Sequence, residues 1–236
     1  MGCMYTIDDF WSRRIPRHQA QMTTPPKGWV SGPDALSTFV EAPLTKNLEL
    51  TGDVDPNKSP VILVSAPGAV GKSTLARQIS SRSGGIYIDL SISEPVGGNS
   101  LSGGLYKSGL INEWADGSVT AFIDGLDEAR LRVTQEAFEA FLRDVAHMAR
   151  ARAAPVVMFG RTGAIQDTWI LLSTEIDASV LEIGYYNSEM SLKFAMERVK
   201  SAIPDSPHHD TCRRAVEALL GKLRSDTVKD RDRFAG

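Results

Sequence analysis

The sequence predicts an α/β fold in which helices cover both faces of a five-stranded parallel sheet. Two observations support this fold class. Five short apolar runs, typical of buried strands, alternate with segments that have helical periodicity, and the runs span residues 61–66, 85–91, 120–124, 155–162 and 179–186. Parallel strands need long crossover connections, which are usually helices, so this alternation indicates a parallel sheet.

Three segments between and after these runs are expected to be helices. The first, "KSTLARQIS", follows the first apolar run directly. The second spans residues 134–151 and has the i, i+3, i+4, i+7 spacing of a one-sided apolar face, formed by Phe138, Phe141, Leu142, Val145 and Met148. The third spans residues 188–203, with an apolar face formed by Leu192, Ala195, Met196 and Val199.

The composition is that of a globular protein from a reducing compartment, and we expect a cytoplasmic location. Hydrophobic residues make up 42% of the 236 residues, and no apolar run approaches the length of a membrane helix. The two cysteines, Cys3 and Cys212, are too few for a disulfide framework. A net charge of -3 gives no electrostatic reason to expect nucleic-acid binding.

The N-terminal residues 1–48 are expected to form an irregular extension. Their prolines oppose helix formation, and these are Pro16, Pro25, Pro26 and Pro33. We expect this extension to pack on the domain through Trp11 and Trp29. The start "MGCMYT" matches a short acylation pattern at Gly2 and Cys3, but a frayed terminus is the favoured interpretation, so membrane association is not expected.

The stretch "SAPGAVGKST" is the most specific motif in the chain. It matches the phosphate-binding P-loop pattern with Ala66 at the first position, and it lies between a predicted strand and a predicted helix. Glycines allow close approach to a phosphate, and the helix N-terminus adds positive potential. The residues expected to bind the nucleotide are Ala66, Pro67, Gly68, Ala69, Val70, Gly71, Lys72, Ser73 and Thr74. Lys72 would reach the β- and γ-phosphates.

The stretch "TAFIDGLDEAR" places three carboxylates directly after a strand that is expected to be buried. A buried carboxylate is costly unless a cation or hydrogen bonds compensate it. In P-loop proteins an Asp at the tip of a neighbouring strand holds Mg²⁺, so Asp124 and the Ser73 hydroxyl are the expected metal ligands. Asp127 and Glu128 would hold and polarise the attacking water, although acids at this position also favour a helix N-terminus.

Two branches of P-loop proteins fit the sequence poorly. A GTPase usually carries an Asn-Lys-x-Asp guanine motif, which is absent. A transporter-type ATPase is suggested by Leu-Ser-Gly-Gly at residues 101–104, but too few residues separate it from Lys72, and Asp124 is followed by Gly125 where that family has Glu. We interpret this tetrapeptide as a coincidental match.

"FIDGLDEAR" resembles the Walker B segment of the NACHT group within the STAND class of signal-transducing NTPases. In that group a small residue after the Asp leaves room beside the metal. "VVMFGRT" resembles the sensor-1 strand of the group, whose Arg, here Arg161, would contact the γ-phosphate. "LEIGYYNSEMSLKFAMERV" resembles the segment that leads into the helical lid, so the resemblance covers residues 60 to about 203.

The resemblance implies a three-layer P-loop core with strand order 5-1-4-3-2, over residues 49–203. It implies a slow, ATP- and Mg²⁺-dependent switch ATPase in signalling or antiviral defence, which binds protein partners or oligomerises on activation. Residues 204–236 would begin a lid, but no Gly-x-Pro motif follows, and we expect a fragment or a chain completed by partners. "PHHD", ending in His208, His209 and Asp210, is interpreted as a helix cap rather than a metal site.

Two alternative functions stay open. The first is an interaction module that binds a nucleotide without turnover. The second is a P-loop kinase for a small molecule, which would need arginines over the transferred phosphate, with Arg130, Arg132 and Arg161 as candidates.

Overall fold

The structure is a computed structural model that describes residues 5–150 and 152–233, with side chains to residue 223. Gly2 and Cys3 therefore lie outside the described residues. The chain forms two compact units. One holds the chain up to Leu36 together with Pro43–Gly184, and the other holds Ser37–Ala42 and the chain from Tyr185 onward.

A seven-stranded mixed sheet forms the centre of the first unit. Its order is β1-β4-β5-β6-β3-β7-β2. The strands are β1 (Trp29–Ser31), β2 (Leu44–Lys46), β3 (Val61–Ala66), β4 (Ile86–Asp89), β5 (Ala121–Asp124), β6 (Val156–Arg161) and β7 (Ala178–Ile183). The prediction of a five-stranded, wholly parallel sheet is therefore wrong. The five expected strands are parallel to one another in the expected 5-1-4-3-2 order, but an antiparallel strand is added at each edge.

Both added strands come from the segment that was expected to be irregular. In β1, Trp29 lies opposite Ile88 of β4, and in β2, Leu44 lies opposite Ile183 of β7. Each has three residues, which is too short for a periodic sequence signal. An exposed edge of a sheet is a template for aggregation, and a very short edge strand leaves few unpaired backbone groups for another chain.

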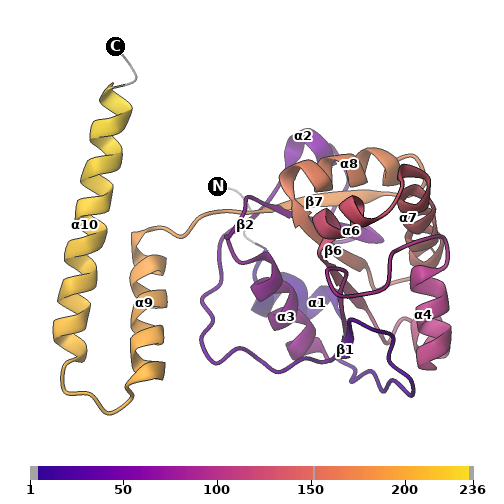
Figure 1. The fold of residues 1–236 in the computed structure, drawn as a ribbon, viewed down its shortest axis with the longest axis horizontal. Coiled ribbons are helices and arrows are strands. Elements are labelled where there is room, and N and C mark those ends of the chain that lie inside the picture. Colours follow the sequence, from indigo (N-terminus) through magenta and orange to yellow (C-terminus); the bar gives the residue numbers. More distant parts are fainter. Residues whose placement is uncertain (1–4, 151, 234–236) are drawn as a thin grey trace. The chain divides into compact units, whose positions relative to one another are not determined.

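Helices cover both faces of the sheet (Figure 1). On one face α3 (Lys72–Ser83) packs on the central parallel strands. The opposite face carries the main apolar core, with α4 (Ser100–Ser108), α7 (Gln135–Ala149) and α8 (Thr162–Leu172). Successive strand residues alternate between these faces. Three shorter helices complete the core, namely α2 (Leu48–Thr51), α5 (Ile111–Ala115) and α6 (Leu126–Arg132).

Helix α7 forms where its periodicity predicted it. Its N-cap Thr134 accepts a hydrogen bond of 3.3 Å from the Ala137 N–H, which satisfies one of the free donors of the first turn. Phe138, Phe141 and Val145 of the expected face are buried, and Met148 is half-buried. The one-sided spacing therefore correctly identified the surface of this helix that packs on the sheet.

The N-terminal extension packs on the first unit through its tryptophans, as expected. It begins with η1 (Ile7–Trp11) and α1 (Ser12–Arg14), and both Trp11 and Trp29 are buried. The Arg14 guanidinium donates to the carbonyls of Ser59 (2.5 Å) and Ala153, in the turns that precede β3 and β6. Arg14 therefore anchors the beginning of the extension near the amino ends of β3 and β6.

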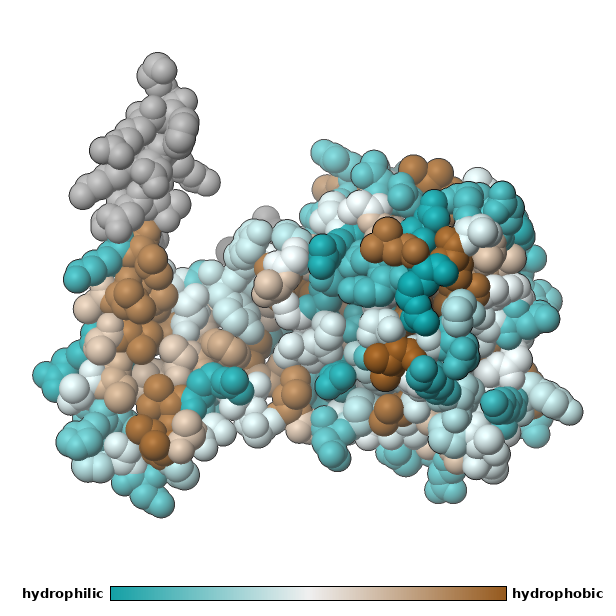
Figure 2. All heavy atoms as spheres, in the orientation of Figure 1, coloured by the Kyte–Doolittle hydropathy of each residue, from teal (hydrophilic) through white to brown (hydrophobic). Residues whose placement is uncertain are grey.

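The second unit is mainly a pair of long helices, α9 (Ser188–Ala202) and α10 (His209–Arg233), which pack side by side (Figure 1). The α9 face predicted to be apolar is only half-buried. Figure 2 shows apolar residues at the surface of both helices, and the exposed ones include Phe194, Leu219 and Leu223. Both helices therefore carry exposed apolar side chains among the described residues.

Candidate nucleotide-binding site

The glycine-rich segment has the strand–loop–helix arrangement of a phosphate-binding loop. Strand β3 ends at Ala66, and α3 begins at Lys72. The loop contains two left-handed residues, Ala69 with φ 62° and Gly71 with φ 91°. A left-handed alanine costs free energy, and such residues cluster at functional sites. A Cβ at Gly68 would meet nothing within 4 Å, so this exposed glycine is not required by packing.

A polar cavity of about 170 Å³ lies beside this loop, at the carboxyl ends of the parallel strands. It brings together six residues predicted for the site, namely Lys72, Ser73, Asp124, Asp127, Glu128 and Arg161. They come from α3, from β5 with the adjoining α6, and from β6, so the topology assembles three segments that are distant in the chain. The other predicted loop residues and Thr74 do not line this cavity. Among the described residues, the Lys72 ammonium has no ion pair.

Asp124 is the last residue of β5 and is only 5% exposed. Its Oδ2 accepts a hydrogen bond of 2.8 Å from the Tyr87 hydroxyl, and its Oδ1 accepts one of 3.0 Å from the Gly125 N–H. Burial, followed by the charge of Asp124, raises the pKa of Tyr87. The hydroxyl is therefore protonated at neutral pH and holds the carboxylate at the cavity wall.

The small residue after Asp124 has a local structural reason. Gly125 has φ 83°, a left-handed conformation that disfavours any residue with a Cβ. A Cβ at this position would also lie 3.1 Å from the Ser91 N–H nitrogen. The left-handed conformation and the nearby Ser91 nitrogen both favour glycine at position 125 even without a metal. The resemblance to the Walker B segment gave a separate reason, which is room beside the metal.

Asp127 contacts Arg161 twice, through a hydrogen bond to its backbone and an ion pair with its side chain. Asp127 Oδ1 accepts a hydrogen bond of 2.8 Å from the Arg161 N–H, and Oδ2 lies 3.5 Å from Arg161 Nε. The Asp127 side chain is 17% exposed and that of Arg161 is 66% exposed. Glu128, the next residue, is exposed and makes no ion pair within the described part of the chain. The two acids thus have different surroundings.

Four further residues line the cavity that the sequence reasoning did not single out, namely Arg77, Tyr87, Asp89 and Ser91. Asp89 could have been found, because it ends an apolar strand just as Asp124 does, and the two lie side by side in the sheet. No local pattern marks Arg77 or Tyr87. The Arg77 guanidinium lies over the Tyr87 ring, 5.2 Å from its centroid.

Two arginines considered for a kinase lie outside this cavity. Arg130 stacks over the Phe138 ring and bonds to Gln135. Arg132 donates to three backbone carbonyls between β4 and α4. Of the three candidates only Arg161 reaches the cavity.

The Leu-Ser-Gly-Gly tetrapeptide lies in α4 and does not line the polar cavity. Leu101 is part of the apolar core. Gly104 lies against the Trp29 ring, where any Cβ would overlap the indole. Packing of the β1 edge strand therefore explains this glycine.

Among the described residues there is neither a cluster of metal-binding side chains nor a membrane-spanning helix. No group of three or more His, Cys, Asp or Glu side chains there is placed to hold a metal ion by itself. His209 is the first residue of α10, at the point where "PHHD" was interpreted as a cap. Within the same residues, every helix is too short or too polar to span a bilayer.

No protein-family model and no curated protein matches the chain. Among solved structures it is similar to the Walker-type ATPase PABY2304 of Pyrococcus abyssi, with 15% identity and a TM-score of 0.49 over 72% of this chain and 61% of that one. It is also similar to a chain in the HORMA:CdnC:Trip13 complex of E. coli MS115-1, with 16% identity and a TM-score of 0.41 over 70% and 59%. Neither match assigns the chain to a family. At this likeness, function does not carry over.

Proposed function

We propose that this protein is an ATP-binding and ATP-hydrolysing molecular switch. The observation that carries the proposal is the meeting of Lys72 and Ser73 with Asp124 in one polar cavity at the end of the glycine-rich loop. A glycine-rich loop between a strand and a helix, a lysine and a strand-end carboxylate form the arrangement that cradles a nucleoside triphosphate and its metal in P-loop proteins.

Magnesium and ATP fit the residues present. Oxygen ligands are what Mg²⁺ prefers, and it keeps several waters, so one carboxylate and one hydroxyl from the protein suffice. Asp124 and Ser73 would supply them. Bound Mg²⁺ would neutralise charge on the phosphate oxygens. Lys72 would bind those oxygens directly, and the backbone N–H groups of the loop would donate hydrogen bonds to them.

The proposed catalytic residues have two tasks, which are accepting a proton from the attacking water and contacting the γ-phosphate. Glu128 is free to accept a proton from an attacking water, because its carboxylate is exposed and unpaired among the described residues. Asp127 would share this task, and its contact with Arg161 also orients the guanidinium. Arg161 would contact the γ-phosphate. Ala66, where the loop begins, pairs with Arg161 in the sheet, which supports this assignment.

We further propose that the switch belongs to the NACHT/STAND class and acts in signalling or antiviral defence. The support is the resemblance of "FIDGLDEAR" and "VVMFGRT" to that class, together with the 5-1-4-3-2 order of the parallel strands. The uncovered apolar side chains of α9 and α10 support self-association on activation. Light scattering of the protein with and without ATP tests this, and a particle mass that ATP leaves unchanged contradicts it.

The deciding experiment is Mg²⁺-dependent phosphate release from ATP and from GTP, with the intact protein and with Asp127→Asn. We expect ATP-selective release that the substitution abolishes while ATP binding persists. Tight ATP binding with no release by either protein would instead establish an interaction module. Transfer of phosphate to an added small-molecule acceptor would establish a kinase.

A further inference from the structure

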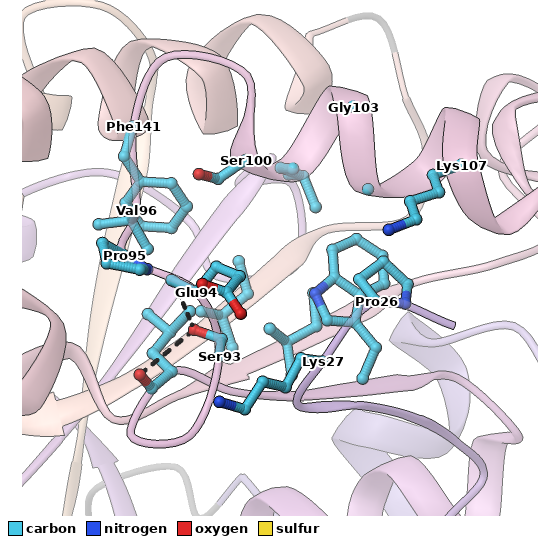
Figure 3. Close-up of a pocket in the computed structure, with 16 residues that line it drawn as sticks. Pro26, Lys27, Ser93, Glu94, Pro95, Val96, Ser100, Gly103, Lys107 and Phe141 are labelled. Carbon is cyan, nitrogen blue, oxygen red and sulfur yellow. Dashed lines mark hydrogen bonds between the residues drawn. The ribbon is translucent and has the colours of Figure 1, made fainter. Parts of the chain in front are cut away.

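A second cavity, of about 190 Å³, lies on the other face of the sheet from the proposed nucleotide site. Figure 3 shows the residues that line it. Its wall is largely apolar and is built by β1, β4, β5, α4 and α7. The apolar side chains are Trp29, Ile88, Leu90, Val96, Leu101, Ile123 and Phe141. No residue lines both cavities, because Ile88 and Leu90 alternate along the chain with Tyr87 and Asp89.

Three charged side chains stand around this cavity, namely Lys27, Glu94 and Lys107. All three are exposed, and none makes an ion pair within the described residues. In Figure 3, Glu94 and Lys107 lie on opposite sides of the cavity, Glu94 on the loop after β4 and Lys107 on α4. Charges of both signs are therefore available beside an apolar wall.

The N-terminus of α4 does not supply an additional anion site here. The buried Asp144 carboxylate already accepts hydrogen bonds from the N–H groups of Leu101 (2.8 Å) and Ser102 (3.1 Å). Negative charge on a ligand would consequently be met by the lysines, and positive charge by Glu94. An apolar pocket with a few convergent polar groups is the usual form of a small-molecule site.

We propose that this cavity binds a small amphipathic zwitterion, an α-amino acid with an apolar side chain. Its ammonium would lie at Glu94, its carboxylate at Lys107, and its side chain against the apolar wall. An apolar cavity of about 150 Å³ accepts benzene, so the volume suits a side chain of about one ring. A purely anionic ligand would leave Glu94 as a repelling neighbour. This site is independent of the proposed nucleotide site, so either proposal can fail alone.

The test is isothermal titration calorimetry of the intact protein without nucleotide, using four probes. L-phenylalanine carries all three features, 3-phenylpropionate lacks the ammonium, phenethylamine lacks the carboxylate, and L-alanine lacks the ring. We expect L-phenylalanine to bind with a Kd of about 1 mM or tighter. The other three should bind about tenfold more weakly, since each loses one interaction with a charged or apolar partner.

Substitutions of residues that line the cavity test whether the ligand binds there. Gly103→Leu adds volume at the wall of the cavity, in a helix position where a Cβ meets only Asn99 Cβ at 3.8 Å, and it should abolish binding while preserving the fold. Glu94→Gln should weaken L-phenylalanine about fivefold or more but leave 3-phenylpropionate no weaker. Lys107→Ala should weaken both carboxylates. Lys58→Ala, an exposed lysine before β3, is the matched control.

Several outcomes overturn the proposal. Absence of heat and of thermal stabilisation with L-phenylalanine at about tenfold the expected Kd rules out the site. Equal binding of 3-phenylpropionate and L-phenylalanine rules out the zwitterion. Binding that persists in Gly103→Leu places the ligand elsewhere on the molecule.

Discussion

The Tyr87 hydroxyl, from within β4, and the Asp124 carboxylate, at the end of the neighbouring parallel strand β5, form a buried hydrogen bond of 2.8 Å. Asp124 is the proposed Mg²⁺ ligand, and Tyr87 is the donor that holds one of its oxygens. Asp124 is thus oriented by the protein before any metal arrives, and its second oxygen accepts a hydrogen bond from the adjacent Gly125 N–H.

Tyr87→Phe should therefore lower stability even without metal. Loss of one hydrogen bond to a buried charge is expected to reduce the free energy of unfolding by about 1–3 kcal/mol. Urea denaturation in the presence of a chelator measures this. Mn²⁺ binding in the presence of ATP, followed by electron paramagnetic resonance, should also weaken. Equal stability of Tyr87→Phe and the parent protein would mean that the bond does not form.

Lys72→Ala should weaken ATP binding about tenfold or more, because it removes the one P-loop cation that would contact the β- and γ-phosphates. Calorimetric titration with Mg²⁺-ATP measures the change. Lys58→Ala removes an exposed lysine before the amino end of β3, at the opposite end of that strand from the P-loop, and serves as the control. If Lys72→Ala retained the parent affinity, the site assignment would be wrong.

Asp127 and Glu128 should differ in what their substitution does to stability. Asp127→Ala removes the acceptor of the Arg161 N–H, which is exposed to water, at an expected cost of about 0.5–1.5 kcal/mol. Glu128→Ala removes an exposed side chain and should change stability by less than about 0.5 kcal/mol. Both should abolish phosphate release. Equal stability changes, measured by urea denaturation, would argue against a structural task for Asp127.

Arg132→Ala should loosen the segment that follows β4. The guanidinium donates to the carbonyls of Leu90 (2.8 Å), Ser91 (3.1 Å) and Ser93 (2.8 Å), so its loss frees three acceptors at once. We expect about 1–3 kcal/mol of destabilisation and faster amide exchange at residues 90–96.

Arg143→Ala is the control for this substitution, since within the described part of the chain its guanidinium has a surface ion pair with Glu139 at 3.9 Å as its one polar contact. Such pairs contribute about 0–1 kcal/mol, so Arg143→Ala should leave exchange at residues 90–96 unchanged. Equal protection of that segment in Arg132→Ala and in the control would show that the Arg132 contacts do not hold it.

The sequence alone determined the features that are encoded by spacing along the chain. Five apolar runs became the five parallel strands, the periodicity of residues 134–151 marked the buried face of α7, and the glycine-rich loop lies between strand and helix as expected. Asp124 ends its strand at the predicted position. Each of these follows from residues a few positions apart, where side-chain period and backbone geometry leave few alternatives.

Only the tertiary structure decided what depends on distant segments meeting. Trp29 and Leu44 lie in strands of three residues, which exist because β4 and β7 offer unpaired edges. Tyr87 and Arg77 reach the site because β4 lies beside β5 under α3. Asp127 became a partner of Arg161 because β5, which precedes Asp127, lies beside β6. Such contacts join residues far apart in the chain, and local sequence patterns do not record them.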